Sequence, residues 1–244
     1  MKISVVIPAH NEEKSLPVSL PTVIAQDYPD FEIIVVDNAS DDGTSDVVRK
    51  FMADNPNTQI KLIMESRKGL LWAREAGRRA ASGDIIANMD ADCLPSPDWL
   101  SKGVKYFADP KIVAVSGPYD YYDGGFVFRY ISLCTQMSIY WLTSRIIQLP
   151  FVKTGAVMIG GNNMIRAEAL HKAGGYNTAR TFYGEDTDTA MRIAPFGRIL
   201  FMNRLQMKTS ARRFRHEGIV KLQLKYLKHF FKLIFSLKQD LEPE

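Results

Sequence analysis

At residues 85–92 the sequence reads Ile85-Ile86-Ala87-Asn88-Met89-Asp90-Ala91-Asp92, an apolar run that ends in two carboxylates one residue apart. Side chains two residues apart in a strand lie on the same side, so Asp90 and Asp92 can converge just beyond the strand's carboxyl end. Two carboxylates directed at one point repel each other unless a cation lies between them, and hard oxygen ligands suit Mg²⁺ or Mn²⁺. A solvent-exposed Asp-rich turn is the alternative, and the motif alone leaves both interpretations open.

The residues before this stretch alternate between short apolar runs and segments with helical patterns. Apolar runs at 3–7, 33–36 and 60–64 predict buried strands, and the segments 15–26, 44–53 and 69–81 predict the helices between them. This alternation predicts an α/β fold, with a Rossmann-like, mostly parallel central sheet that is flanked by helices.

Beyond residue 92 the pattern is less regular, and the expected elements are shorter. We expect a helix that ends near 107, a strand at 112–117, a loop at 119–125, a strand at 157–165 broken by a turn, a short helix at 167–173, a helix at 189–195 and a last strand at 201–207. Many of the predicted strands are followed directly by polar residues, and this is where ligands bind in parallel α/β sheets.

The polar strand ends contain the candidate nucleotide ligands. Asp37 can accept hydrogen bonds from a base or a ribose, Asn11 and Ser40 can donate to phosphate or ribose, and Arg67 or Lys68 can offset phosphate charge. The alternative is helix capping by Asp37, Asp41 and Asp42, which is a routine use of aspartate. Each residue alone favours capping, whereas four polar strand ends together favour a ligand site.

The composition indicates a globular protein, because 46% of its 244 residues are hydrophobic and 24% are charged. Two cysteines, Cys93 and Cys134, make neither a disulfide framework nor a zinc set, so we expect a reducing, cytoplasmic setting. The apolar run at the N-terminus is too short for a signal peptide, and no uncharged apolar run is long enough to span a bilayer. Residues 204–238 hold ten Lys or Arg and one acid, which favours a local anionic partner over nucleic acid.

Two segments have unusual apolar patterns. Residues 126–151 include a stretch, 130–144, without any charge, which fits core or oligomer packing or a helix that faces a membrane or a lipid acceptor. Residues 217–238 predict a basic amphipathic helix that either packs on the core or binds an anionic membrane surface. Its apolar residues are Leu222, Tyr226, Leu227, Phe230, Phe231, Ile234 and Phe235, and its basic residues are Lys221, Lys225, Lys228 and Lys232.

Two further motifs allow a structural or a functional interpretation. Gly160-Gly161-Asn162-Asn163 is either a plain turn or a place where the backbone approaches a ligand closely. The pair Glu185-Asp186 precedes a predicted helix, where acids stabilise the helix dipole. In the functional interpretation Asp186 is a general base that the helix N-terminus keeps ionised.

Six segments together resemble the family 2 glycosyltransferases of the GT-A fold. They occur in the family's order and spacing over roughly residues 1–200, and they are 5–13, 35–44, 73–77, 89–92, 161–163 and 184–186. The resemblance implies one domain at 1–210, in which 1–117 bind the nucleotide sugar and 118–210 the acceptor, followed by a basic amphipathic extension at 211–244. It also implies a metal-dependent, inverting transfer of a sugar from an NDP-sugar to a saccharide or lipid-linked acceptor.

The resemblance assigns roles to individual positions. The nucleotide-sugar ligands would be Pro8, Ala9, Asn11, Glu12, Asp37, Asn38, Ser40, Arg67, Lys68, Asp90 and Ala91. The donor diphosphate would be bound through Mg²⁺ or Mn²⁺ on Asp90 and Asp92, with His216 as a candidate third ligand that could equally belong to an exposed basic cluster. The catalytic base would be Asp186, with Glu185 beside it, and the acceptor would contact Gly161, Asn162 and Asn163.

Some positions depart from the family pattern. Asn38 stands where many relatives have an aspartate, His10 replaces a common tyrosine, and the motif typical of polymerising members is only loosely matched at 211–214. We therefore expect one sugar to be transferred per binding event, at the inner face of a membrane and in a protein that can be oligomeric. The rival functions are a nucleotidyltransferase, which would need a Gly-rich basic loop after the first strand, and a non-catalytic membrane-associated binding protein.

Overall fold

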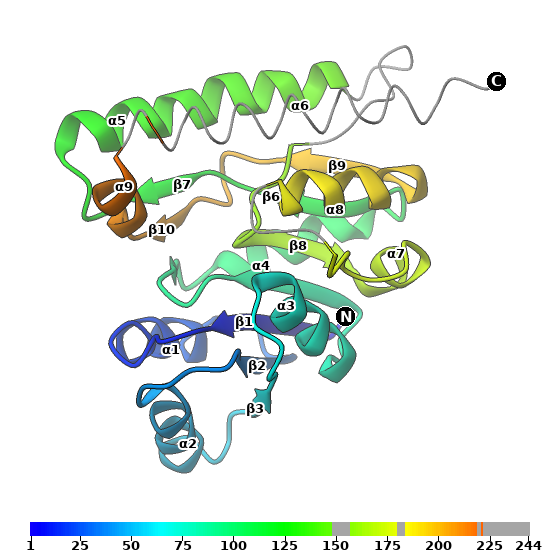
Figure 1. Cartoon of the computed structure of the whole chain (residues 1–244). Coiled ribbons are helices and arrows are strands. Elements are labelled where there is room, and N and C mark those ends of the chain that lie inside the picture. Colours follow the sequence, from blue (N-terminus) through cyan, green and yellow to red (C-terminus); the bar gives the residue numbers. More distant parts are fainter. Residues whose placement is uncertain (148–156, 180–183, 219–220, 222–244) are drawn as a thin grey trace.

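The computed structural model describes residues 1–147, 157–179, 184–218 and 221. Its centre is a seven-stranded sheet of order β3-β2-β1-β4-β8-β6-β9, and a small sheet of order β5-β10-β7 lies beside it (Figure 1). In the large sheet the pairs β3–β2, β2–β1, β1–β4 and β6–β9 are parallel, and among its described strands β8 alone runs antiparallel to its neighbours, β4 and β6. The predicted mostly parallel α/β sheet is confirmed.

The bounds of the elements follow the chain order. The strands are β1 Ile3–Ala9, β2 Phe31–Asp37, β3 Ile60–Met64, β4 Ile85–Met89, β5 Leu94–Pro95, β6 Ile112–Ser116, β7 Tyr119–Tyr121, β8 Asn162–Arg166, β9 Arg198–Phe201 and β10 Met207–Thr209. The α-helices are α1 Leu16–Ile24, α2 Thr44–Asp54, α3 Leu70–Ala80, α4 Trp99–Val104, α5 Phe126–Thr135, α6 Trp141–Ile147, α7 Ala167–Lys172, α8 Glu185–Ile193 and α9 Arg212–Glu217. Short 3₁₀ turns follow α4 and α8, and a π-helical turn, Gln136–Tyr140, joins α5 to α6.

Helices cover both faces of the large sheet, which is why its central strands are apolar on both sides. One core cluster packs the sheet against α1, α2 and α4, and the other packs it against α3, α7 and α8. Gly77 lets α3 lie close to the sheet, because a Cβ atom there would come within 2.3 Å of a Val6 methyl carbon. The strand ends that carry the polar motifs are therefore held at one edge of a well-packed sheet.

Three predicted elements differ in the structure. The helix expected from Thr189 begins at Glu185, because Gly184 turns the chain with φ +83° and the acids that follow suit a helix N-terminus. The segment 119–125, which is expected as a loop, contains strand β7. This strand is three residues long, and its pairing with the distant β10 produces no recognisable pattern in so short a sequence. The single strand expected at 201–207 is divided between β9 and β10 by a turn in which Leu205 N–H donates to the Met202 carbonyl.

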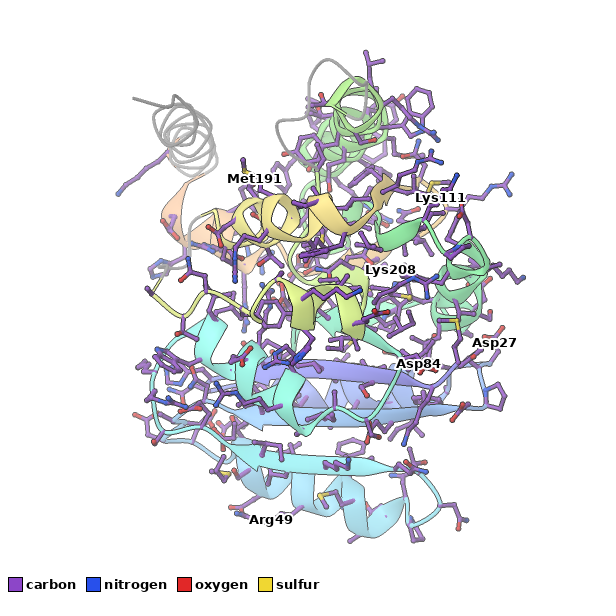
Figure 2. All side chains as sticks on the ribbon, turned by 90° about the vertical axis from the view of Figure 1, so that its right-hand side faces the viewer. Asp27, Arg49, Asp84, Lys111, Met191 and Lys208 are labelled. Atoms are coloured by element: carbon purple, nitrogen blue, oxygen red, sulfur yellow. The ribbon has the colours of Figure 1, made fainter. Side chains whose placement is uncertain are left out.

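Residues 126–147 form one continuous helical segment, α5–α6, along the edge of the molecule (Figure 1). In the view of Figure 2 it lies at the opposite end of the molecule from Arg49 on α2. Of the alternatives for this segment, burial in the core does not describe it, whereas packing on another copy and a helix that faces a membrane or lipid acceptor stay open. Large apolar side chains on it are exposed: Phe126, Val127, Tyr130, Ile131, Met137, Tyr140, Trp141 and Leu142.

The predicted basic amphipathic helix at 217–238 lies outside the described residues, apart from Glu217, Gly218 and Lys221. Among the described residues, no helix is both long and apolar enough to cross a membrane.

Candidate active site

A cavity of about 440 Å³ lies at the carboxyl ends of β1, β2 and β4. Predicted donor-binding residues contribute to its wall, namely Pro8, Glu12, Asn38, Lys68, Asp90, Ala91 and Asp92. The first residues of α9 close the other side with Arg212, Arg213 and Phe214. The sheet thus brings together residues at or after the ends of β1, β2, β3 and β4 and residues from a helix more than 100 residues further along the chain.

Asp90 is held by two groups that come from other elements. The buried Arg74 of α3 places Nη2 3.3 Å from Asp90 Oδ1, and the Tyr119 hydroxyl donates to Asp90 Oδ2 at 3.0 Å. Gly161 makes room for this arrangement, because a Cβ atom there would come within 2.1 Å of Asp90 Oδ2. The Asp90 side chain remains 38% exposed, so its carboxylate is accessible from the cavity.

Asp92 is held by a different arginine. Arg212 Nε lies 3.1 Å from Asp92 Oδ2, and the same guanidinium donates to the carboxylate of Glu12, at 2.9 Å for one nitrogen. Burial and the neighbouring Asp90 charge raise the pKa of Asp92 to about 6, although Arg212 opposes that shift. We call Glu12–Arg212–Asp92 the outer bridge.

Arg74 connects Asp90 to the second acidic motif. Its guanidinium is buried, with Nη1 3.5 Å from Glu185 Oε1 and its Nε without a hydrogen-bond partner. We call Asp90–Arg74–Glu185 the inner bridge. It joins the carboxyl end of β4 to the N-terminus of α8, so the two acidic motifs lie on either side of one buried cation.

The acids of α8 have raised pKa values. Burial, together with the Asp186 charge, raises the pKa of Glu185 to about 8, and burial also raises the pKa of Asp186. The Thr187 N–H donates to Asp186 Oδ1 at 2.7 Å and opposes the shift without cancelling it. We expected the helix N-terminus to favour the ionised form of Asp186. Desolvation acts in the opposite direction and is the largest cause, so the pKa of Asp186 lies above its ordinary value. Asp186 also acts electrostatically on Tyr140, the last residue of the π-helical turn before α6.

The first two polar loops are bound to each other. Asn11, whose φ is +57°, donates its N–H to Ser40 Oγ at 3.0 Å, and its Oδ1 accepts from the Asp41 N–H at 3.0 Å. Asp37 is buried and accepts from the Ser40 N–H and from a hydroxyl at the start of α2. Ala9 is also buried. These residues connect the first two polar loops, and they do not belong to the residues that line the cavity.

The hydrogen bonds of Asn38 explain why an asparagine suits this position, where many relatives have an aspartate. Its amide nitrogen donates to the carbonyls of Glu65 and Arg67 at 3.1 and 2.8 Å, and its Oδ1 accepts from the Gly69 N–H at 2.7 Å. An aspartate has no donor for the two carbonyls, so the asparagine fixes the loop before α3. The Arg67 Cζ atom lies 3.8 Å from the centroid of the Trp72 ring, and the same guanidinium pairs with Glu65. These two contacts hold the positive charge of Arg67 at the loop before α3.

The predicted acceptor residues have structural partners. Asn162 accepts from the Trp99 indole N–H at 3.0 Å and donates to the Leu205 carbonyl, and Asn163 pairs with Asn88 at 2.7 Å. Both asparagines are buried, so these bonds hold the turn that carries Gly161 against Asp90. Their predicted contact with the acceptor stays a prediction.

His216 lies on the exposed side of α9 and does not belong to the cavity lining. Within the described ranges, no group of three or more His, Cys, Asp or Glu side chains is arranged to hold a metal ion. Asp90 and Asp92 still fit a hard divalent cation, because such ions commonly use one or two carboxylates and take their other ligands from phosphates and water. Both carboxylates line the cavity, and the Asp90 side chain is 38% exposed, which is consistent with that role.

Sequence reasoning missed the roles of four residues of the site. Arg74 lies in the segment 73–77, which by itself identifies no ion-pair partner. Tyr119 lies in the expected loop 119–125, and Arg212 lies in the loosely matched motif at 211–214. His10, noted only as a replacement, lines the cavity and donates from Nδ1 to the Asn38 carbonyl at 2.9 Å. A basic residue inside an apolar helix face, as at Arg74, was the one local signal that pointed to a buried ion pair.

The chain is similar in sequence to curated glycosyltransferases. Over 127 residues the chain is 37% identical to the glycosyltransferase AglE of Haloferax volcanii, which covers 50% of this chain and 41% of that protein. It is 33% identical over 106 residues to the undecaprenyl-phosphate 4-deoxy-4-formamido-L-arabinose transferase of Aeromonas hydrophila, over 42% of this chain and 32% of that protein. The chain thus spans well under half the length of these curated relatives.

A solved structure extends the likeness over most of the chain. The mannosyltransferase PcManGT of Pyrobaculum calidifontis, in complex with GDP-Man and Mn²⁺, superposes with a TM-score of 0.75 and 28% identity, over 96% of this chain and 64% of that one. The model of the family described as Glycosyl transferase family 2 matches residues 4–174. The match contains β1 to β4, the Asp-x-Asp stretch and the turn at Gly161, and the chain therefore belongs to the family 2 glycosyltransferases.

Proposed function

We propose that the protein transfers a sugar from a nucleoside-diphosphate sugar to an acceptor, in a metal-dependent reaction with inversion at the sugar carbon. The observation that carries the proposal is the pairing of Asp90 and Asp92 at a cavity with the acids of α8, which Arg74 ties to Asp90. A site for a diphosphate and a site for proton removal then lie on either side of one buried cation.

Asp90 and Asp92 would hold Mg²⁺ or Mn²⁺ together with the donor diphosphate. When bound, such an ion neutralises the negative charge that develops on a leaving diphosphate. The likeness to a mannosyltransferase that was solved with GDP-Man and Mn²⁺ supports this assignment. Arg212 adds a second positive charge at the cavity wall, where it can contact the phosphates.

Asp186 would act as the general base. It takes the proton of the attacking acceptor hydroxyl while the new bond forms at the sugar carbon and the bond to the diphosphate oxygen breaks. A carboxylate with a raised pKa is suited to this task, because proton transfer is most effective when the pKa lies near the working pH. A single displacement inverts the sugar carbon and needs no second nucleophile.

The acceptor would be a lipid-linked phosphate or a saccharide. The relative of Aeromonas hydrophila that is named an undecaprenyl-phosphate transferase supports the lipid-linked class. A phosphate acceptor needs little help in losing a proton, whereas a saccharide hydroxyl needs a general base. The extent to which the transfer rate depends on Asp186 therefore also indicates the acceptor class.

A thermal-shift panel tests the donor site. UDP, GDP and TDP are added with and without Mn²⁺, and we expect one of them to raise the Tm only when the metal is present. A panel in which no nucleotide raises the Tm, with metal or without, would contradict a nucleotide-sugar site.

Two carboxylate variants test the roles, with an exposed aspartate as the matched control. Asp92→Asn should abolish the metal-dependent nucleotide shift. Asp186→Asn should keep that shift and lower the rate of sugar transfer by about 10²- to 10⁴-fold. Asp46→Asn, on the surface of α2, should change neither. Transfer that survives both site substitutions would overturn the assignments, and metal-dependent binding without any transfer or donor hydrolysis would favour a binding protein.

A further inference from the structure

The exposed apolar side chains of the described residues concentrate on α5–α6. Eight of the fourteen large hydrophobic side chains that are exposed lie on this one segment, with Phe126 at 82%, Ile131 at 59% and Leu142 at 53%. They lie one to three residues apart except between Ile131 and Met137, where the exposed Cys134 lies, so they form an apolar stripe in two parts along the helix. A stripe of this length on the surface indicates an interaction site, because soluble proteins seldom expose contiguous apolar patches.

The polarity of the helix is inverted. Gln136 and Ser144 are 5% and 2% exposed, and they face the protein, whereas the apolar residues face outward. Gln136 exchanges two hydrogen bonds with the Tyr119 backbone, at 2.8 and 3.0 Å, which fixes the helix in this orientation. The outward apolar face is therefore imposed by specific polar contacts on the inner side.

The outer face, which we define as Phe126, Val127, Tyr130, Ile131, Trp141 and Leu142, has the chemistry of a membrane interface. No charged residue occurs from 130 to 144, and aromatic residues gather towards both ends of the stripe. Phe126 stacks on Tyr130 at 6.3 Å, and the Arg145 guanidinium lies 5.5 Å from the Trp141 ring. Tyrosine, tryptophan and arginine at the ends of an apolar stripe suit the headgroup region, where one end of the side chain is wet.

The outer face is continuous with the cavity through an aromatic cluster. Phe128 of α5 packs on Tyr121 and Phe214, with ring centroids 5.3 and 4.9 Å apart, and the last two residues line the cavity. The basic residues of α9 lie beside this cluster, and Arg215 pairs with Asp123 at the loop before α5. A binding partner that contacts the outer face would therefore also lie close to the basic residues of α9 at the opening of the cavity.

We propose that the outer face of α5–α6 docks the protein on a phospholipid bilayer, with the helix lying in the headgroup region and the cavity facing the polar end of a lipid-linked acceptor. The docking stands on the helix alone, and its link to the acceptor rests on the proposed function. Interfacial helices of this kind bind through buried apolar area and through attraction to anionic lipids.

Vesicle sedimentation tests the docking with the full chain. The vesicles contain phosphatidylglycerol and phosphatidylcholine in equal amounts, and the double variant Ile131→Glu/Leu142→Glu should bind at least about tenfold more weakly than the wild type. Val18→Glu is the matched control, because Val18 is 57% exposed on α1, away from the outer face, and it should bind like the wild type. Circular dichroism and the Tm should be the same for all three proteins.

Trp141 gives a second readout that does not depend on a charge substitution. The chain has three tryptophans, of which Trp99 is buried and Trp72 lies under Arg67. The same vesicles should shift the fluorescence emission to shorter wavelength and brominated lipids should quench it, and Trp141→Phe should remove both effects while Trp72→Phe keeps them.

Three results would overturn the proposal. They are unchanged vesicle binding by the double variant, an emission shift that persists in Trp141→Phe, and a wild-type dimer that the double variant converts to a monomer without any effect on vesicles. The last result would make the outer face an interface between two copies. Because vesicle binding needs neither donor nor turnover, failure of the docking and failure of the proposed sugar transfer are separate results.

Discussion

The inner and outer bridges use the same chemistry in opposite surroundings. In each, one arginine joins one aspartate of the Asp-x-Asp stretch to a further glutamate. The Arg74 side chain of the inner bridge is 4% exposed, whereas the Arg212 side chain of the outer bridge is 49% exposed. A buried pair cannot exchange its partners without a large desolvation cost, whereas an exposed pair can. The inner bridge is therefore part of the fold, and the outer bridge can yield to a ligand.

The largest effect should come from breaking the inner bridge. Arg74→Met leaves the Asp90 carboxylate and the buried Glu185 carboxyl group without their shared cation, and we expect a loss of about 3–5 kcal/mol in the free energy of unfolding. Chemical denaturation measures it, and Arg74→Lys, which keeps the charge, should lose clearly less. A loss below about 1 kcal/mol for Arg74→Met would show that the inner bridge is not the fixed element described above.

The two bridges could not be predicted from the sequence, unlike the sheet that carries them. The parallel sheet was predictable because buried strands such as 33–36 are continuous apolar runs, and the positions of Asp90 and Asp92 followed from their place after one of them. The bridges join residues 74 to 185 and 12 to 212, and no local pattern records a contact across such separations. The predicted start of α8, at Thr189, is too late. The acids Glu185 and Asp186 give no apolar pattern, although they already belong to the helix.

A smaller effect should appear in the pH dependence of stability. The pKa of Glu185 is about 8 in the folded protein, against an ordinary value of 4.5, so the folded state binds more protons between these pH values. The contribution of Glu185 to stability is therefore fully present below about pH 4.5 and is lost as the pH rises through 8.

Glu185→Gln removes this titration from the inner bridge. Between pH 5 and pH 9 the wild type should lose more than about 1 kcal/mol relative to the variant, which thermal or urea unfolding at several pH values can measure. Glu168→Gln, at an exposed site on α7, is the control and should follow the wild type. Parallel stability curves for wild type and Glu185→Gln would mean that the charge on Arg74 outweighs the burial of Glu185.

The smallest effect on stability should come from the outer bridge, and it should be accompanied by a gain in metal binding. Arg212→Met removes an arginine that is 49% exposed, and the two carboxylates it pairs with line the cavity, where water can take the place of the guanidinium. The free energy of unfolding should therefore change by less than about 1 kcal/mol. The substitution also frees Asp92, whose Oδ2 now lies 3.1 Å from the guanidinium, and removes a positive charge that repels a cation there. In calorimetric titrations without nucleotide, Mn²⁺ should therefore bind several-fold more tightly. Arg215→Met removes the same charge from the same helix but leaves Asp92 untouched, so equal Mn²⁺ affinities in the two variants would mean that Arg212 does not compete for the cation's place.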